Sequence, residues 1–366
     1  MKKKNICEIA LVFSFLLLFI GSVWAQNTVE LSPPIQLGTS GGNLNDVSRL
    51  YCCGGTLGSL VTDGSFRYIL SNNHVLARTN MGHPGELIVQ PGLIDENCRQ
   101  DSGDAVADLS RFVPISFTMG TLNTVDAAIA QVLNDCSSSS CVDPTGSILG
   151  IGQVSSSTVA PIPKMPVKKS GRTTGLTHGT ITSTNATVKV SYYKTCGMGS
   201  QTATFTGQIL IGTGGFSGAG DSGSLIVEDC SNNPRGVGLL FAGSNTVTVA
   251  NPINNVLSNL HVSMVGGSNY CISGVTGSST ARPQLPSHVK HKTIEGVSKV
   301  KERHEEAILK AEGVVGAGVG LSETVPEEVV IEVYVKKPAR EMKHVIPEVL
   351  EGVSVKIVET GEIVAF

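Results

Sequence analysis

The stretch 216–224 (FSGAGDSGS) constrains this chain more than any other, because it places Ser222 between glycines and directly after Asp221. Without a Cβ, Gly220 and Gly223 allow the backbone to turn tightly and allow a peptide to approach it closely. The backbone N–H groups of Gly220 and Ser222 are then able to converge on a developing oxyanion, where each donor matters most. The pattern favours the loop of an acyl-transfer nucleophile, and a surface loop rich in glycine and serine is the alternative.

Two upstream stretches supply the partners that such a serine needs. His74 follows the largely hydrophobic run 66–70, and Asp126 lies in the otherwise apolar segment 124–130, which we expect to be a strand. A buried aspartate without a partner is costly, so Asp126 requires one in the folded protein. Taken singly, such a histidine is more often a core or surface residue and such an aspartate more often a cap. Together they follow the order His, Asp, Ser, one of three known for a Ser-His-Asp triad.

With these motifs, the chain resembles a chymotrypsin-fold serine protease over roughly residues 48–275. The family's own template then gives the expected roles. His74 is the general base, Asp126 orients it, and Ser222 is the nucleophile. The backbone amides of Gly220 and Ser222 form the oxyanion hole.

The segment 167–175 (VKKSGRTTG), followed by Gly179, narrows the resemblance. Taken from its residues alone, it is a tight turn that joins two strands. It is similar to the Ser-Gly-Arg-Thr-Thr-Gly hairpin of the bacterial α-lytic protease and streptogrisin branch. In that branch the arginine pairs with the aspartate before the catalytic serine. The resemblance therefore implies an ion pair between Arg172 and Asp221 that supports the nucleophile loop.

The resemblance also indicates where a peptide binds. Ala242, Gly243 and Ser244 are expected to form an edge along which a substrate adds as an extra strand. Phe216 lies six residues before the candidate serine, where trypsin-like enzymes place an acid, and Ser217 is next to it. We therefore expect a small or apolar side chain, not arginine or lysine, before the scissile bond.

The chain divides into five segments by composition. These are a signal peptide (1–25), a flexible lead-in (26–47), a protease domain (48–266), a Gly/Ser/Pro-rich linker (267–286) and a small C-terminal domain (287–366). The first segment has a basic start, an apolar run and small residues before its end, which is typical of a cleaved signal. An uncleaved anchor is the alternative, for which the apolar run is short. We therefore expect a secreted or periplasmic protein without membrane contact after cleavage.

The protease domain is rich in glycine and in short apolar runs separated by turn residues, which predicts a mainly β fold. We expect two six-stranded antiparallel β-barrels of the chymotrypsin type. His74 and Asp126 lie in the first and Ser222 in the second, so the site lies between the barrels. A small α+β domain follows, with a helix over 288–311 and several strands.

The C-terminal domain differs from the rest, because it has no cysteine and many charges. It resembles a pro-domain or regulatory domain only loosely. We expect it to contact the protease domain in cis, as an inhibitor or folding aid, and the extended end 361–366 to be able to lie in the substrate cleft as a bound product. The linker is open to cleavage, which would release the domain. An unrelated binding domain is the alternative.

Nine cysteines are present, and Cys7 leaves with the signal. The remaining even number predicts up to four disulfides in an exported protein. Cys136 and Cys141 are expected to pair, and Cys196 with Cys230 is the next expectation. The alternative, zinc, lacks CxxC spacing and a histidine at ligand distance. We expect no metal and no cofactor, and the net charge of -3 argues against nucleic acid as a partner.

The sequence thus predicts an exported serine endopeptidase that hydrolyses peptide bonds in proteins or peptides through an acyl-enzyme. Two alternatives stay open: a catalytically silent binding module on the same fold, and a protease that processes only itself.

Overall fold

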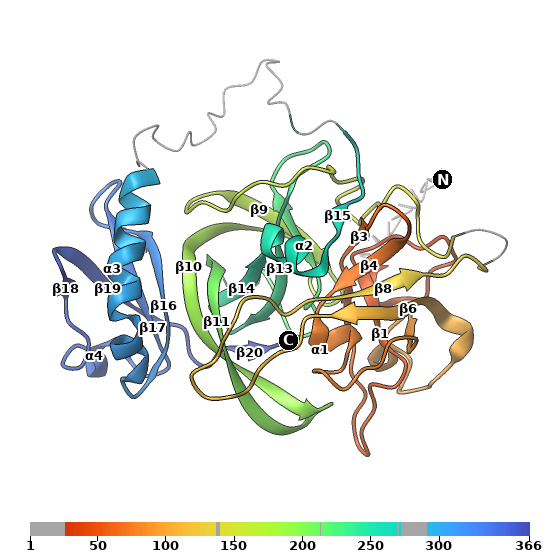
Figure 1. Cartoon of the computed structure of the whole chain (residues 1–366), viewed down its shortest axis with the longest axis horizontal. Coiled ribbons are helices and arrows are strands. Elements are labelled where there is room, and N and C mark those ends of the chain that lie inside the picture. Colours follow the sequence, from red (N-terminus) through yellow and green to blue (C-terminus); the bar gives the residue numbers. More distant parts are fainter. Residues whose placement is uncertain (1–25, 137–139, 213, 269–270, 272–290) are drawn as a thin grey trace, which may run out of the picture.

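The computed structural model describes residues 26–136, 140–212, 214–268, 271 and 291–366. The expected signal peptide and most of the expected linker lie outside these ranges. Among the described helices, none is long and apolar enough to cross a membrane. The described chain is mainly β, as expected, and is arranged as two β-barrels with a smaller C-terminal part beside the second (Figure 1).

The first sheet closes into a barrel because one strand is bent. Its described strands are β1 (Thr39–Asn43), β2 (Gly55–Leu57), β3 (Ser59–Thr62), β4 (Arg67–Ser71), β5 (Leu87–Val89), β6 (Ala105–Phe112), β8 (Ala128–Val132) and β15 (Ser263–Met264). Only Gly58 separates β2 from β3, so the two form one strand that pairs with β1 at one end and β4 at the other. Counted so, β1 to β6 and β8 make the expected six-stranded antiparallel barrel, and β15 extends β3.

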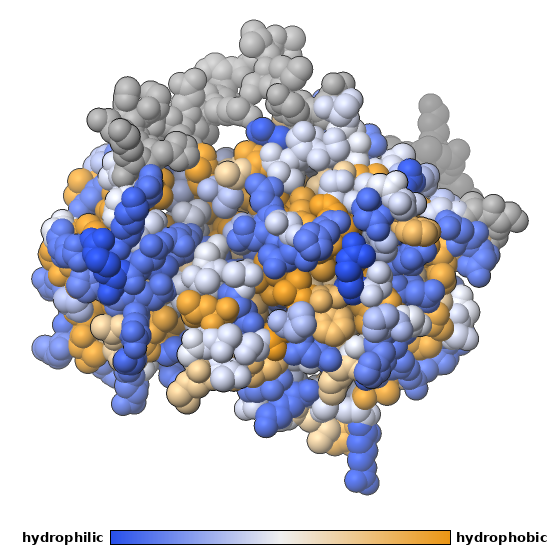
Figure 2. Space-filling view, viewed as in Figure 1, coloured by the Kyte–Doolittle hydropathy of each residue, from blue (hydrophilic) through white to orange (hydrophobic). Residues whose placement is uncertain are grey.

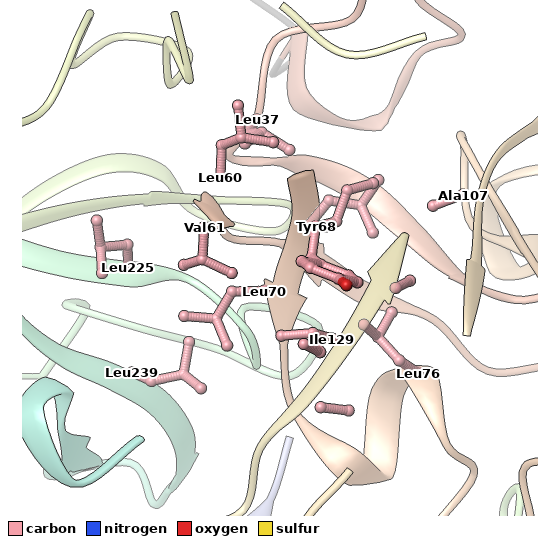
Figure 3. Packing of buried hydrophobic residues seen from close by; sticks show 14 of the residues in the cluster. Leu37, Leu60, Val61, Tyr68, Leu70, Leu76, Ala107, Ile129, Leu225 and Leu239 are labelled. Atoms are coloured by element: carbon pink, nitrogen blue, oxygen red, sulfur yellow. The ribbon is translucent and has the colours of Figure 1, made fainter. Parts of the chain in front are cut away.

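One apolar cluster contains residues of both barrels and joins them (Figure 3). Within the first barrel, Leu70 of β4 lies opposite Ile129 of β8, so aliphatic side chains on neighbouring strands pack together. Leu60 belongs to the same cluster, as do Leu225 and Leu239 from the second barrel. Each such leucine contributes about 1.5–3 kcal/mol when fully buried, so this core fixes the barrels relative to each other.

The second barrel is also a closed ring. Its described strands are β9 (Pro166–Gly171), β10 (Gly175–Thr195), β11 (Met198–Gly212), β12 (Leu225–Glu228), β13 (Gly236–Gly243) and β14 (Val247–Pro252). They follow the order β10-β9-β12-β13-β14-β11, and an additional β10–β11 pairing closes the ring. The second predicted six-stranded barrel is therefore confirmed.

Short elements complete the two barrels. They are α1 (Asn73–Leu76), α2 (Ile253–Leu260), β7 (Leu122–Asn123) and the 3₁₀ turns η1 (Gln26–Thr28), η2 (Leu93–Asp95) and η3 (Ser102–Asp104). Of these, α1 follows β4 directly and carries His74. Strand β7 joins the second sheet, where it runs parallel to β11.

The C-terminal part has an apolar core of its own and also extends the second sheet. Its described elements are α3 (His291–Lys310), β16 (Val314–Leu321), β17 (Val329–Val335), α4 (Ala339–Met342), β18 (Val349–Leu350), β19 (Val353–Glu359) and β20 (Val364–Ala365). Strand β16 pairs antiparallel with β10, so one sheet runs from β18 through the second barrel. Helix α3 packs its apolar residues on β16 and β17, and hydrophilic side chains cover its outer side (Figure 2).

Two sequence-based expectations about local structure are wrong. Residues 26–47 are not a flexible lead-in, because they contain β1, which is fully buried and pairs with both β2 and β5. Asp126 is not in a strand, because β8 begins at Ala128. The glycines and polar residues of β1 indicate a loop, although strands elsewhere in the chain pair with it and bury it. The apolar neighbours of Asp126 indicate a strand, although the strand begins two residues later.

The eight cysteines of the described residues form four disulfides: Cys52–Cys98, Cys53–Cys196, Cys136–Cys141 and Cys230–Cys271. The expected Cys136–Cys141 pair is confirmed, and the expected Cys196–Cys230 pair is wrong. Cys196 lies at the turn between β10 and β11 and ties this hairpin to the first barrel through Cys53. Spacing along the chain does not reveal a link of this kind, because it joins the two barrels.

The bend at Gly58 yields a test of the fold. A Cβ at this position would lie 1.9 Å from the backbone oxygen of Gly223, beside the candidate nucleophile. We expect Gly58→Ala to lower the free energy of unfolding by roughly 1–3 kcal/mol or more, because two backbones must move apart. In the matched control, Gly296→Ala, the new Cβ meets nothing within 4 Å on an exposed helix, and a gain of up to about 1 kcal/mol is expected. Equal thermal unfolding midpoints for Gly58→Ala and the parent would show that the close approach of the two backbones does not require glycine.

Candidate active site

His74 is held on a short helix at the end of the first barrel. Its neighbours in α1, Val75 and Leu76, are buried and anchor the helix in the core. The Asn73 side chain donates to the Val113 carbonyl at 2.7 Å, and the Asn72 side chain donates to the Asp126 carbonyl at 2.7 Å. The helix is thereby fixed to the loops around it, while the imidazole of His74 lines a cleft.

Asp126 is completely buried, and its carboxylate accepts three hydrogen bonds. His74 Nδ1 lies 2.6 Å from Oδ2, and the His74 backbone amide donates to Oδ1 at 3.2 Å. The Tyr192 hydroxyl of β10 donates to Oδ2 at 2.9 Å. The side chain of Asn251 in β14 binds the backbone N–H and carbonyl of Asp126. The partner that a buried aspartate needs is therefore present, and donors from both barrels contribute.

The charge on Asp126 controls the titration of its neighbours. Burial acts to lower the pKa of His74, but attraction to the Asp126 carboxylate and the hydrogen bond to it outweigh burial, and the pKa of His74 is raised. Burial and the same carboxylate raise the pKa of Tyr192 well above its ordinary value, so Tyr192 stays a neutral hydrogen-bond donor. The ring edges also meet, because the centroids of His74 and Tyr192 lie 5.8 Å apart in a T-shaped arrangement.

The loop that carries Ser222 needs glycine at positions 220 and 223. Gly220 has a φ of 99° and Gly223 a φ of 95°, in the region that favours glycine. A Cβ on Gly223 would lie 2.2 Å from the Thr56 carbonyl. From the first barrel, Thr56 binds the loop through its N–H to the Ser222 carbonyl at 2.7 Å and its hydroxyl to the Gly220 carbonyl at 3.0 Å. The loop is therefore clamped between the barrels.

The Ser222 hydroxyl bonds away from His74, and the expected oxyanion donors have no acceptor among the described residues. The Ser222 hydroxyl donates to the Phe241 carbonyl at 3.0 Å, not to His74. In the described part of the chain, no acceptor is bound to the backbone amides of Gly220 or Ser222. His74 Nε2 instead lies 3.0 Å from the carbonyl oxygen of Phe366. The expected nucleophile and base thus each bond to a backbone carbonyl, one of them at the end of the sequence.

The expected Arg172–Asp221 ion pair is wrong. Arg172 binds Asp95 instead, with Nε 2.7 Å from one carboxylate oxygen and Nη2 2.6 Å from the other. The cation beside Asp221 is Lys169, whose Nζ lies 3.5 Å from Oδ2, and both side chains are completely buried. Burial lowers the pKa of Lys169, and Asp221 opposes this effect. Lys169 reaches Asp221 from β9, whose last residue, Gly171, lies beside the Asp221 carboxylate.

Backbone and hydroxyl donors satisfy the rest of the Asp221 carboxylate. Gly218 N donates to it at 2.9 Å, Thr173 N at 2.8 Å and the Thr174 hydroxyl at 2.7 Å. Arg172 still supports the loop from outside, since a Cβ on Gly220 would lie 2.6 Å from its Nη1. Asp221 therefore anchors the turn 172–174 to the nucleophile loop, as the resemblance implied, but with a different cation.

Two of the five residues expected to bind substrate line a cleft of about 1010 Å³. Ser217 and Ser244 line it, together with His74 and Gly220. Ala242 and Gly243 are the last residues of β13, and both pair with β20 of the C-terminal part. Phe216 is buried in an apolar cluster against which Phe366 packs.

Sequence reasoning missed several residues of this site. Three strand residues bind an aspartate that is distant in sequence: Tyr192 and Asn251 bind Asp126, and Lys169 binds Asp221. A tyrosine, asparagine or lysine in a strand gives no local signal of such a contact. Asp46 was also missed. Its side chain is 6% exposed beside the cleft, and burial raises its pKa to about 6.

Three groups of metal-ligand side chains occur among the described residues, and each includes disulfide-bonded cysteines. These are Asp46 with Cys53 and Cys196, Asp135 with Cys136 and Cys141, and Glu228 with Cys230 and Cys271. A sulfur in a disulfide is not a thiolate, so these groups lack the ligand that a zinc site would use.

No protein-family model matches this chain, and no curated protein matches it. Solved structures do. A glutamic acid specific serine protease is 20% identical, with a TM-score of 0.42 over 63% of this chain and 100% of its own. Thermobifida fusca Protease A is 20% identical, with a TM-score of 0.41 over 64% and 99%. An α-lytic protease homologue, N4, is 16% identical, with a TM-score of 0.38 over 63% and 98%.

The buried cation can be tested by substitution. We expect Lys169→Met to lower the free energy of unfolding by roughly 3–5 kcal/mol, because it leaves the Asp221 charge buried without its ion-pair partner. Arg172→Met is the matched control, and it should cost less because Asp221 keeps all its donors. Urea unfolding of both variants measures the difference. An equal or larger loss in Arg172→Met would restore the arginine as the partner of Asp221.

Asp46 predicts a pH dependence of stability. Its pKa of about 6 in the folded protein exceeds the ordinary value of 3.8, so the folded state holds the proton more tightly. The resulting stability, about 3 kcal/mol, is fully present below pH ~4 and is lost as the pH rises through ~6. Asp46→Asn should therefore raise the unfolding midpoint at pH 8 and leave it nearly unchanged at pH 4. A variant that shifts the midpoint equally at both pH values would refute this assignment.

Proposed function

We propose that this chain is an exported serine endopeptidase of the chymotrypsin-like type. The observation that carries the proposal is the contact of 2.6 Å between His74 Nδ1 and the buried Asp126 carboxylate, in the same cleft as the loop of Ser222. The clamped loop, its two left-handed glycines and its two unbonded amides add support. Substrates are peptide bonds in proteins or peptides.

The residues fit the steps of acyl transfer. Ser222 Oγ turns from the Phe241 carbonyl to His74 Nε2, gives its proton to that nitrogen and attacks the peptide carbonyl. The amides of Gly220 and Ser222 bind the oxyanion. His74 then passes the proton to the leaving amine, and an acyl-enzyme forms. A water, deprotonated by His74, releases the acid and restores Ser222. Asp126 stabilises the imidazolium in both halves of the reaction.

This chemistry needs no metal or organic cofactor. Four disulfides among the described residues are typical of an oxidising compartment and support a secreted or periplasmic location. We further propose that residues 287–366 act on the protease in cis, since β16 pairs with β10 and β20 with β13.

The alternative of a different class is a catalytically silent module that binds peptides on the same fold. The bond from Ser222 to Phe241, in place of one to His74, is the observation that favours it. A protease that cuts only itself keeps the chemistry and differs in its substrate. Labelling of Ser222 separates the silent module from both protease forms.

We expect a fluorophosphonate probe, incubated to completion with the full chain, to label Ser222 as identified by mass spectrometry. Ser222→Ala should remove the label, and His74→Ala should slow labelling strongly, because the serine then lacks its base. Loss of one triad member costs turnover on the order of 10⁴-fold in this family. Thermal unfolding of both variants controls for folding. A folded parent chain that is never labelled would favour the silent module.

A further inference from the structure

The end of the sequence lies in the cleft as an added β-strand. We call residues 361–366 the tail segment. Ala365 pairs with Ala242, and Val364 pairs with Gly243, both antiparallel to β13. On its other side, Val364 pairs with Ser191 of β10. Figure 1 shows β20 running toward α1, with the C-terminus between the barrels.

The last residue makes three contacts in the cleft, and those of its N–H and its ring are contacts that a residue before a scissile bond would make. The Phe366 N–H lies 3.3 Å from the Phe241 carbonyl, the group that also accepts from Ser222. The Phe366 carbonyl oxygen lies 3.0 Å from His74 Nε2. The ring lies over Gly243, where a Cβ would be 2.6 Å from the ring atom Cζ. Glycine at 243 thus leaves room for a large ring.

We propose that residues 363–366 occupy the enzyme's own subsites, so that the chain blocks itself and cleaves best after an aromatic residue. This inference rests on the proposed function, and it names the regulation and the substrate class of the same site. The residue that precedes the scissile bond corresponds to Phe366, and the fourth residue before the bond corresponds to Ile363.

The contact with the Phe366 carbonyl also disables the base. A carbonyl only accepts hydrogen bonds, so Nε2 of His74 must carry a proton to bond to it. A carboxylate likewise accepts from Nδ1. His74 is therefore an imidazolium in this arrangement and cannot take the proton of Ser222. Its raised pKa agrees with this state. The tail segment thus blocks the subsites and the proton transfer together.

The C-terminal part positions the tail segment and is itself packed against the second barrel. The N–H groups of Thr360 and Gly361 donate to the Val335 carbonyl at 2.9 and 3.2 Å. Ile363 is completely buried in a cluster that includes Phe241 and Tyr334, so barrel and C-terminal part share a core. Release of the whole domain by linker cleavage would expose this core. Displacement or trimming of the tail segment alone would open the cleft.

Side-chain burial indicates which subsites select substrate. Ile363 is fully buried, and Phe366 packs on an apolar cluster that includes Phe216. Val364 is 38% exposed and is held mainly through its backbone. Selection should therefore be strong for an aromatic residue before the scissile bond, and for a branched aliphatic residue three positions earlier. The position of Val364 should tolerate any side chain.

The test uses full-length variants, because removal of the tail segment risks exposing the core. Phe366→Asp places a charge in the apolar pocket and should free the cleft, while Ile363 keeps the core intact. Val364→Asp adds the same charge two residues away, on an exposed side chain, and is the matched control. A tethered segment has an effective concentration on the order of millimolar, so a segment that binds at ~0.1 mM blocks about nine-tenths of the sites. Phe366→Asp should thus label with fluorophosphonate roughly tenfold faster than the parent, and Val364→Asp at the parent rate.

The substrate class is tested on the freed variant, Phe366→Asp. The probes are acetyl-Ile-Val-Ala-Xaa-p-nitroanilides in which Xaa is Phe, Ala, Arg or Glu. We expect the Phe substrate to have the highest kcat/KM, at least tenfold above Arg and Glu. A preference for Arg or Glu would overturn the assignment of the aromatic pocket.

A binding arm separates this proposal from the proposed function. The double variant Ser222→Ala/Phe366→Asp is titrated with fluorescein-labelled Ile-Val-Ala-Phe, and anisotropy is measured. If this peptide binds and no form of the protein is labelled by fluorophosphonate, the protease assignment fails while the tail site stands. If Ser222 is labelled at equal rates in parent, Phe366→Asp and Val364→Asp, the tail proposal fails while the protease assignment stands.

Discussion

The buried carboxylate of Asp126 is the interaction on which the rest of the site depends. A charge without solvent must receive donors from its surroundings, and no single element supplies them here. The donors to the carboxylate are His74, from the helix after β4, and Tyr192, from β10, while Asn251 of β14 binds the backbone of Asp126. Satisfying one anion therefore requires both barrels to be folded and docked. The shared apolar core supplies that docking, and Thr56 extends it to the loop of Ser222.

Strand β10 connects this charge to the C-terminal part. It is 21 residues long, much longer than a strand of a small barrel needs to be. Along its length it pairs with β9, β11, β16 and β20. Tyr192 donates to Asp126, and its neighbour Ser191 bonds to the tail through both backbone and side chain. The tail and the triad region therefore contact adjacent residues of one strand.

Features that depend on residues close together in the sequence could be predicted, and features that depend on contacts between distant segments could not. Local chemistry indicated His74, Asp126 and the loop of Ser222, because glycines and apolar flanks constrain their own neighbourhood. The resemblance placed a cation beside Asp221 but assigned it to Arg172, since the choice of Lys169 depends on how β9 packs against the loop. Tyr192 and the Cys53–Cys196 bridge were not predictable, because each joins segments that meet only when the barrels dock. The buried β1 was mistaken for part of a flexible lead-in, because its own glycine-rich sequence does not reveal its pairing with β2 and β5.

Tail binding and protonation of His74 must strengthen each other, if the tail carbonyl bonds to Nε2 only when that nitrogen carries a proton. By linkage, whatever raises the proton affinity of His74 also raises its affinity for the tail. The negative charges that face the imidazole, Asp126 directly and Asp46 at longer range, both act in this direction. The Asp126 carboxylate makes His74 an effective base when the cleft is open. It therefore also stabilises the arrangement in which the tail segment occupies the cleft. Competition for the strand position on β13 opens the cleft, and by the same linkage so does deprotonation of His74, because Nε2 then no longer donates to the tail.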